Sequence, residues 1–397
     1  MTNALTDIRS VDLLDLDHYT SKADHALFRR LRNDDPVHFN EGPDGIGFYA
    51  LTRYDHVSAI GRDHLRFING KGTQIRDKRA EGHGAPSVHN ADQPLHARLR
   101  APGVGAFRRS LLERREGRIR EIVRDLIDAT PKDEPFDFVE KIAVTIPMIV
   151  FAEVLGVPQS RQVDLVNWAN TMSDVSAPDV IQADARHHLF DYFRELAAEK
   201  RAHPGDDIAS ALVNADLGAE PLTKEELDAY FMVLTVAGNE TTRFLLTGGL
   251  EALLTSPGQL DQLRSDPGLI PSAIEEMARW VSPVLQMRRT ATEDVDLFGT
   301  PIKAGDKVVL YFASANRDER VFEDAGQFMV DRKGNRHLGF GVGAHFCMGA
   351  HLARLEAKIF LEEFIRDIRD VHVVSPSTRA RSNWFTGYDN LMLRWSR

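Results

Sequence analysis

Hydrophobic residues recur at helical spacing along much of the chain, most clearly in two segments. Residues 228–246 are apolar on nearly every side and follow a capping-box pattern, Thr223-x-x-Glu226, which predicts a long and buried helix. After Gly349, apolar residues return at three- and four-residue steps, which predicts a second helix. These residues are Leu352, Leu355, Ile359, Phe360 and Phe364.

Weaker patterns predict further elements. Residues 25–35 and 271–280 have helix-like patterns, and residues 47–52 have a strand-like one. No linker, internal repeat or low-complexity stretch interrupts the 397 residues. We therefore expect residues 1–397 to form a single domain.

The charge balance narrows the class of protein. Lysine and arginine number 49 against 59 aspartates and glutamates, for a formal net charge of −10, and 43% of the residues are hydrophobic. This composition excludes general disorder and argues against nucleic-acid binding, which usually needs a basic surface. No apolar run reaches the roughly 18 residues of a spanning helix, and no signal-peptide pattern is present. We expect a cytoplasmic protein without a membrane anchor.

The single cysteine, Cys347, excludes an intramolecular disulfide and a multi-cysteine zinc site. Taken alone, it is best interpreted as a small buried hydrophobic residue. Its neighbours favour another role, because Gly339, Gly341 and Gly343 predict a specially shaped loop just before a helix begins. Backbone N–H groups and the helix dipole stabilise a thiolate at such a position, and a thiolate is a soft ligand for iron.

The segment Phe340-Gly341-x-Gly343-x-His345-x-Cys347-x-Gly349 resembles the haem-binding signature of the cytochrome P450 family. In that family the cysteine thiolate is the proximal ligand of the iron of haem b. The resemblance implies a mainly α fold with a smaller β-rich region. It places the haem between a long oxygen-activating helix and the helix after the cysteine loop, and assigns Phe340, Gly341, His345, Cys347 and Gly349 to haem binding.

The predicted long helix contains a polar cluster, Ala237-Gly238-Asn239-Glu240-Thr241-Thr242. Alone, this cluster would indicate a polar contact between helices. Beside the cysteine loop it resembles the family's A-G-x-[D/E]-T-[T/S] stretch, which implies that Ala237 and Gly238 lie at the haem. Glu240 and Thr241 then take the positions of the acid and the alcohol that deliver protons to dioxygen. Glutamate stands where the family more often has aspartate.

Two further sets of residues follow from the resemblance. Glu276 and Arg279 match the family's E-x-x-R, and Arg332 is the candidate for the arginine that completes this structural triad; Ala325 stands where proline is more common. Haem propionates need cationic donors. The resemblance implies that these donors are His96, Arg100, Arg289 and His345. Arg288 is an alternative to Arg289.

The substrate pocket is the least readable part. Positions relative to the family motifs imply that the loop 73–90 and a set of mostly apolar residues line the pocket. The same residues could equally belong to the hydrophobic core. They are Val233, Val236, Ala237, Val284, Leu285, Trp384 and Phe385. The surrounding segments look most like those of bacterial members that oxidise terpenes, steroids or branched lipids. We expect insertion of one atom of O2 into a C–H bond of an apolar small molecule. The alternatives are a haem-thiolate peroxygenase or isomerase, or a non-catalytic haem-binding protein.

A local excess of arginine suggests a partner. Residues 96–124 contain nine arginines and three glutamates. An ordinary solvated helix face is an equal alternative. In the family this region lies on the proximal side, so we predict that an acidic iron–sulfur ferredoxin docks here, steered by Arg108, Arg109 and Arg115.

Overall fold

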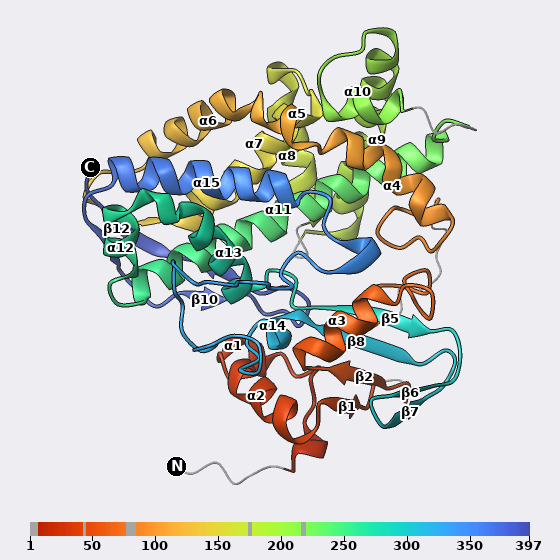
Figure 1. Ribbon diagram of the computed structural model, residues 1–397. Helices are drawn as coiled ribbons and strands as arrows, with labels where there is room; N and C mark the ends of the chain where they lie inside the picture. Colours follow the sequence, from red (N-terminus) through yellow and green to blue (C-terminus); the bar gives the residue numbers. More distant parts are fainter. Residues whose placement is uncertain (1–6, 43–44, 77–84, 174–176, 216–219) are drawn as a thin grey trace.

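Helices form most of the molecule, and a smaller sheet-rich region lies beside them (Figure 1). The computed structural model describes residues 7–42, 45–76, 85–173, 177–215 and 220–397. The helices in this part of the chain are α1 (Asp17–Thr20), α2 (Asp24–Asp34), α3 (Tyr54–Arg62), α4 (Leu95–Ala106), α5 (Arg109–Glu113), α6 (Glu116–Asp128), α7 (Thr145–Leu155), α8 (Gln159–Ser173), α9 (Asp179–Ala202), α10 (Ile208–Val213), α11 (Lys224–Thr255), α12 (Gln259–Ser265), α13 (Ile270–Val281), α14 (Phe312–Ala315) and α15 (Ala350–Asp367). Shorter helical turns are η1 (Ile8–Ser10), η2 (Val139–Ala143), η3 (Pro267–Leu269) and η4 (Gly343–His345).

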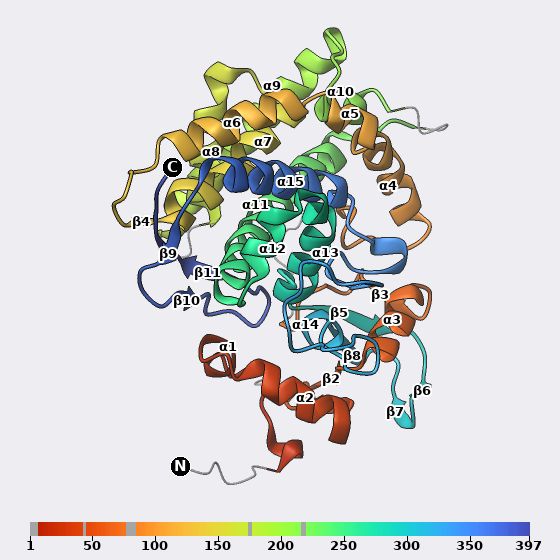
Figure 2. The same ribbon diagram turned by 60° about the vertical axis from the view of Figure 1, so that its left-hand side comes forward.

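The strands are short and form one larger sheet and three small ones. They are β1 (Val37–Asn40), β2 (Phe48–Leu51), β3 (Phe67–Ile68), β4 (Phe136–Asp137), β5 (Gln286–Ala291), β6 (Val295–Leu297), β7 (Thr300–Ile302), β8 (Lys307–Tyr311), β9 (Val371–Val373), β10 (Thr378–Arg379), β11 (Tyr388–Asn390) and β12 (Met392–Trp395). The larger sheet has the order β1-β2-β8-β5-β3, in which β2 and β8 are parallel and the other pairs antiparallel. With α1, α2 and α3 it forms the lower part of Figure 2.

The sheet is buried on both faces, as β8 shows. Val308 and Leu310 pack into the apolar cluster on one face, and Val309 and Tyr311 pack into a second cluster on the other. Successive side chains of a strand point to opposite faces, so a nearly continuous apolar strand indicates burial on both sides.

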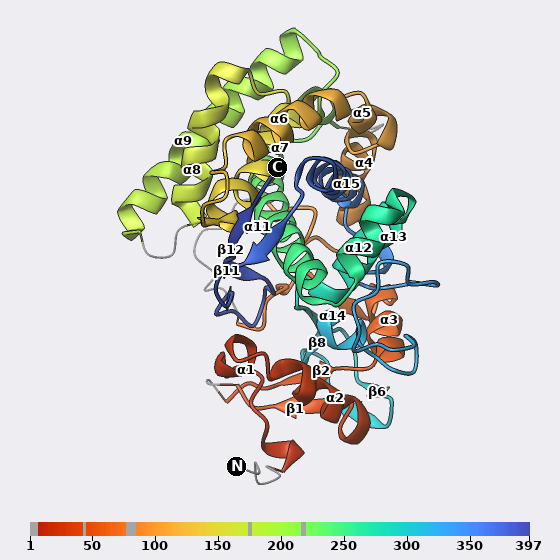
Figure 3. The same ribbon diagram turned by 90° about the vertical axis from the view of Figure 1, so that its left-hand side faces the viewer.

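The predicted long helix is α11, which begins at the predicted capping box. The Thr223 hydroxyl accepts from the N–H of Glu226 at 3.2 Å, and the Glu226 carboxylate accepts from the N–H of Thr223 at 3.0 Å. Helix α11 contacts α7, α9, α13 and α15, and Figure 3 shows α15 nearly end-on beside it. The predicted helices 25–35 and 271–280 correspond to α2 and α13, and the strand 47–52 to β2. The expected mainly α fold with a smaller β-rich region is confirmed.

Helix α4 approaches α11 and the cysteine loop very closely. A Cβ atom at Gly103 would collide with the Tyr230 hydroxyl and with the sulfur of Met348, so only glycine fits there. Among the described residues, no helix is both long and apolar enough to span a bilayer.

Candidate functional site

The loop before α15 owes its shape to two glycines. Gly341 and Gly343 have φ angles of 73° and 75°, a backbone conformation that other residues rarely adopt. A Cβ atom at Gly343 would also meet the carbonyl oxygen of Gly61 in α3 at 2.5 Å. The loop closes through a hydrogen bond from the Cys347 N–H to the carbonyl of Phe340 at 2.9 Å. Cys347 is thereby held three residues before α15 begins.

Cys347 is an exposed residue of the loop, but the surroundings of its thiol do not favour the thiolate. The enclosing protein limits the access of water and so raises the pKa of the Cys347 thiol, although the N–H groups of Gly349 and Ala350 and the charges of Arg100 and Arg354 act in the opposite direction. The N–H groups at the helix terminus do stabilise the thiolate, as expected, but their effect on the pKa is smaller than that of burial. A coordinated metal ion would remove the proton directly.

The middle of α11 faces open space. Leu234 and Thr235 are buried, whereas Val236 is 38% exposed and Ala237 is also exposed, and a Cβ atom at Gly238 would meet no neighbour. Near the start of the same helix, Tyr230 contacts Met348, the neighbour of Cys347, at 3.6 Å between oxygen and sulfur. The exposed stretch of α11 thus belongs to a helix that reaches the cysteine loop.

Glu240 and Thr241 lie on this stretch. The Thr241 hydroxyl donates to the carbonyl oxygen of Ala237 at 2.8 Å, one turn earlier. Burial raises the pKa of Glu240, Arg243 lowers it at 3.7 Å between the charged groups, and Asp389 of β11 raises it further. Sequence reasoning missed Arg243 and Asp389. The i, i+3 spacing of Glu240 and Arg243 was an available signal, whereas nothing local indicated Asp389.

Two arginines and two histidines gather beside the cysteine loop. The rings of His96 and His345 lie 4.1 Å apart between centroids, and Arg100 donates to the carbonyl of Phe346 at 2.6 Å. Burial lowers the pKa of His345 to about 2, and Arg289, His96 and Arg100 lower it further. The structure therefore brings together His96, Arg100, Arg289 and His345.

Among the described residues, none of these four side chains forms an ion pair with a carboxylate. The buried Nε2 atom of His96 has no hydrogen-bond partner, and burial lowers the pKa of Arg289 to about 10, opposed by the charge of Asp92. The side chain of Arg289 donates to the carbonyl of Arg288 at 2.9 Å. The side chain of Arg288 donates instead to the carbonyl of Gln74 at 3.4 Å and to the hydroxyl of Thr290 at 3.2 Å, so the geometry favours Arg289 over Arg288 as the anion ligand.

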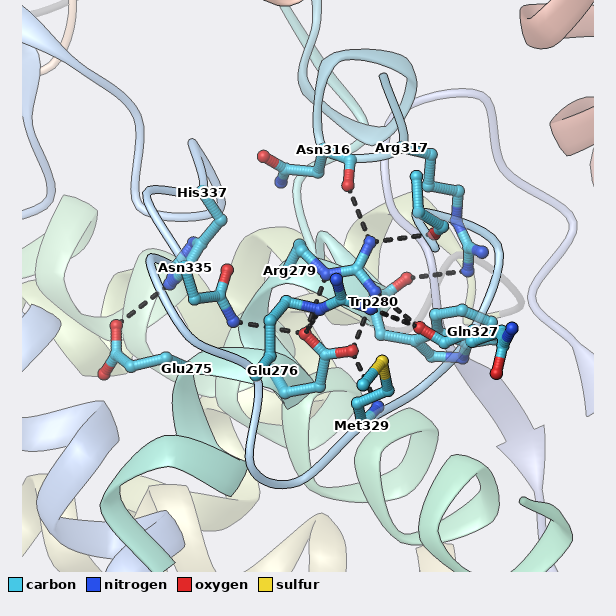
Figure 4. A network of polar contacts seen from close by, with 12 residues as sticks. Glu275, Glu276, Arg279, Trp280, Asn316, Arg317, Gln327, Met329, Asn335 and His337 are labelled. Carbon is cyan, nitrogen blue, oxygen red and sulfur yellow. Dashed lines mark hydrogen bonds and ion pairs between the residues drawn. The ribbon is translucent and has the colours of Figure 1, made fainter. Parts of the chain in front are cut away.

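Glu276, Arg279 and Arg332 form a buried network, most of which Figure 4 shows. Arg279 donates twice to the Glu276 carboxylate, both at 2.7 Å, and Arg332 donates to it at 2.9 Å. Asn335 and the N–H of Met329 complete its partners at 3.1 and 2.9 Å. The remaining donors of Arg279 bind the carbonyls of residues 316, 325 and 327. The network fastens the chain between α14 and the cysteine loop.

The predicted substrate residues separate into two groups. Val284 pairs with Phe385 in an isolated β-bridge, and both are partly exposed, as are Trp384, Val233 and Val236. Leu285 is different, since it is fully buried in the core with Tyr19 and Phe28. Its prediction as a pocket residue is wrong, because the next residue of an extended chain points to the opposite face. Within the predicted loop 73–90, residues 77–84 lie outside the described residues.

The arginine-rich segment is largely neutralised within the chain. Seven of its nine arginines form ion pairs: Arg98, Arg109, Arg114, Arg115, Arg118, Arg120 and Arg124. Arg115 pairs with Glu153 at 3.1 Å and donates to the carbonyl of Asp206 at 2.7 Å, so it has a structural role. Arg108 is exposed and has no ion pair among the described residues. The free positive charge is smaller than the sequence count indicates.

Comparison with known proteins gives the same family by three routes. The family model for cytochrome P450 matches residues 268–373. The chain is 35% identical to linalool 8-monooxygenase of Pseudomonas putida, covering 96% of this chain and 97% of that one. It is 36% identical to methyl-branched lipid omega-hydroxylase of Mycobacterium tuberculosis, with 98% and 95% covered, and 36% identical to steroid C26-monooxygenase of the same species, with 94% and 92% covered. The solved structure of cytochrome P450 CYP109Q5 from Chondromyces apiculatus superimposes with a TM-score of 0.89, at 32% identity and coverage of 98% of this chain and 99% of that one.

Fold and relatives together define a haem-dependent oxidoreductase of the monooxygenase class. The chain belongs to the cytochrome P450 family, whose members bind haem b through a cysteine thiolate. The residues present fit this cofactor. Cys347 is the single cysteine, the buried Nε2 atom of His96 has no partner, Arg289 has no carboxylate at ion-pair distance among the described residues, and Val236 and Ala237 leave an apolar, exposed stretch on α11.

Proposed function

We propose that this protein inserts one oxygen atom from O2 into a C–H bond of an apolar small molecule, of the terpene, steroid or branched-lipid type. The observation that carries the proposal is that two parts of the site lie close to each other. A cysteine loop, with arginines and histidines that lack a counter-charge, lies near a helix whose exposed stretch combines apolar residues with Glu240 and Thr241. The activities of the three relatives suggest the substrate classes. A cytoplasmic location and a single domain stay predictions.

Cys347 would hold the iron, and His96, Arg100, Arg289 and His345 would hold the propionates. When bound, haem b supplies the one-electron and dioxygen chemistry that forms the product and releases the second oxygen atom as water. The propionates would give Arg100 and Arg289 a counter-charge and the Nε2 atom of His96 a partner, because each propionate oxygen accepts charge-assisted hydrogen bonds. Burial of these residues then costs less, so the cofactor stabilises the site that binds it.

Glu240 and Thr241 would carry protons into an otherwise apolar site. Release of water from dioxygen consumes two protons, which must reach a place from which bulk water is excluded. The raised pKa of Glu240 allows its carboxyl group to hold and release a proton closer to neutral pH than a solvated glutamate. Thr241 already uses its hydrogen toward Ala237, so its oxygen is free to accept a hydrogen bond from water.

The first test is the carbon monoxide difference spectrum of the reduced holoprotein, with the Cys347→Ser variant beside it. We expect a strongly red-shifted Soret band in the wild type and its loss in the variant, because serine is not a thiolate donor. Apolar terpenes, steroids and branched lipids are then screened by the spin-state shift and by product analysis. A wild type that folds and receives haem yet lacks the band would refute the thiolate assignment.

The proton role is tested with a matched pair of threonines on α11. Thr241→Ala should lower the fraction of reducing equivalents that end in product and raise peroxide, whereas Thr241→Ser should restore much of the coupling. Thr235 makes the same bond to the preceding turn, to Phe231 at 2.8 Å, but is buried in the core. Thr235→Ala therefore controls for the loss of that bond, and equal uncoupling in both alanine variants would contradict the relay.

We further propose that an acidic iron–sulfur ferredoxin delivers electrons at the face formed by α4, α5 and the start of α15. Arg108 and Arg109 are its exposed cations, and Arg109 pairs with Glu113 in a bond that solvent screens. The double variant Arg108→Glu/Arg109→Glu should slow electron transfer and flatten its dependence on salt. Arg9→Glu, at an exposed site in η1, is the control. Unchanged rates in the double variant would exclude this face.

A further inference from the structure

A second pocket lies where α2, the C-terminal half of α11, the end of α13 and the segment around β10 and β11 meet. It has a volume of about 240 Å³, and none of residues 337–349 lines it. Its walls combine cationic and aromatic side chains, among them Lys22, His25, Trp280, Arg317, Arg379 and Tyr388. Neither the proposed oxidation nor the haem site uses these residues.

Arg317 is the unusual member of this wall. Its side chain is nine-tenths buried, and the carbon of its guanidinium lies 3.7 Å from the ring centroid of Trp280. One donor binds the carbonyl oxygen of Trp280 at 3.1 Å, as Figure 4 shows. Stacking fixes the plane of the guanidinium and leaves its N–H edges free to bind. Among the described residues, no carboxylate lies within ion-pair distance of Arg317.

The carboxylates nearby already have partners. Asp24 accepts two hydrogen bonds from Arg379, at 2.8 and 3.3 Å, and Glu251 pairs with Lys22 at 3.2 Å. Of the cations Lys22, Arg317 and Arg379, Arg317 is therefore the one without an ion pair among the described residues. A nearly buried guanidinium without a counter-charge is costly, which is reflected in its pKa: burial lowers it to about 9, and Arg279 and Arg379 lower it further, against Asp24 and Glu276.

The pKa of His25, the histidine of this pocket, reflects the same excess of positive charge. Burial lowers the pKa of His25 well below its usual value, and four cations lower it further, Arg317, Arg379, Arg32 and Lys22. Its Nδ1 atom has no hydrogen-bond partner, and lies 3.8 Å from Asp24. His25 is therefore neutral, and its side chain is about one-third exposed at the wall of the pocket.

We propose that this pocket binds a small oxyanion, phosphate-like or carboxylate-like, with Arg317 as the principal ligand and Lys22 and His25 at its side. The planar guanidinium matches two oxygen atoms of either anion. The aromatic rings of Trp280 and Tyr388 also leave room for the apolar body of an organic acid.

The test uses holoprotein in two measurements. Thermal unfolding is compared in phosphate, in selenate and in chloride of equal ionic strength, and crystals soaked in selenate are examined for the anomalous signal of selenium. We expect phosphate and selenate to raise the Tm above the chloride value, and one selenium peak beside Arg317. Benzoate in competition with selenate distinguishes the source: displacement indicates an organic carboxylate, and retention an inorganic anion.

Arg317→Gln should weaken binding about tenfold or more, since it removes a charged hydrogen-bonding ligand. Arg381→Gln, two residues from Arg379 but outside the pocket, should bind like the wild type. Lys22→Gln, at a half-exposed position, should weaken binding a few-fold and keeps the test open if Arg317→Gln fails to fold. No anion-specific rise of the Tm in the wild type, or full affinity in Arg317→Gln or Lys22→Gln, would overturn the site.

Discussion

Two groups of arginine side chains, one with histidines beside it, differ in the partners that compensate their charge. Arg279 and Arg332 share the carboxylate of Glu276 and spend their other donors on backbone carbonyls. Arg289 and His345 belong to a group with no carboxylate among the described residues at ion-pair distance. In the first group the protein itself compensates the charges, so the group has a structural role. In the second group a ligand has to compensate them.

The contrast shows why cation burial alone does not identify a binding site. Arg279 is more deeply buried than Arg289, yet it has the Glu276 carboxylate as an ion-pair partner, whereas burial lowers the pKa of Arg289 to about 10. The two arginines differ in the hydrogen-bond and ion-pair partners that the protein gives them. We therefore expect substitutions in the two groups to have opposite effects on the protein without haem.

The largest effect should come from removing the charge of Glu276. Burial acts to raise its pKa, but Arg279, the N–H of Met329 and Arg332 lower it, so the carboxylate is charged in the folded protein. Glu276→Gln leaves two buried guanidinium groups unpaired and should lower the free energy of unfolding by about 3–5 kcal/mol. Urea denaturation measures this, with Glu134→Gln, an exposed position, as the control. A loss below that of an ordinary surface substitution would contradict the structural role.

Glu356 of α15 extends the comparison to carboxylates. It is buried, its Oε2 atom has no partner, and burial raises its pKa to about 8. The folded protein therefore keeps a proton on Glu356 that the unfolded chain has lost above a pH of about 4.5. Stability contributed by this proton falls as the pH rises from about 4.5 to 8, by about 2–4 kcal/mol.

Glu356→Gln should remove this pH dependence, because the amide does not titrate. The difference in unfolding free energy between the variant and the wild type should therefore grow in favour of the variant as the pH rises, and level off above pH 8. Denaturation curves at several pH values measure it. Parallel curves for the two proteins would show that Glu356 is already ionised or partnered.

Arg289→Leu should act with the opposite sign to Arg279→Leu. It removes a buried charge without a counter-charge, so the unfolding free energy of the haem-free protein should stay unchanged or rise by about 1–3 kcal/mol. Haem retention should fall about tenfold or more, because a charged ligand of a propionate is lost. Arg279→Leu is the matched substitution and should destabilise the protein strongly. Equal destabilisation by both would mean that Arg289 has a structural partner.

The smallest effect is expected on the surface. The pair of Arg109 and Glu113 is exposed at both ends, and such pairs contribute about 0–1 kcal/mol. Arg109→Gln should therefore leave the unfolding free energy within that range while still slowing ferredoxin-dependent reduction. A large loss of stability would show that α5 depends on this pair, and would weaken the interpretation of its charge as a docking feature.

The sequence predicted what depends on neighbouring residues. The capping box at Thr223, the helix after Gly349 and the loop glycines are local patterns, and each corresponds to an element or a φ angle of the structure. Leu285 was misassigned because composition does not say which face of an extended chain is buried. The pairing of Arg115 with Glu153, and of Arg120 with Glu363, joins residues far apart in the chain. The pocket at Arg317 is lined by five separate parts of the chain, and no local pattern indicates it.

The network around Arg279 also determines how the protein opens locally. Residues 316–349 connect α14 to α15 with η4 as their helical turn, and guanidinium donors, in place of a sheet ladder, bind the carbonyls of Asn316, Ala325 and Gln327. A segment held through a few shared partners unfolds as one cooperative unit. Cys347 lies near the end of that unit. Cleavage by a protease within residues 316–342 and release of the cofactor are therefore two results of a single opening.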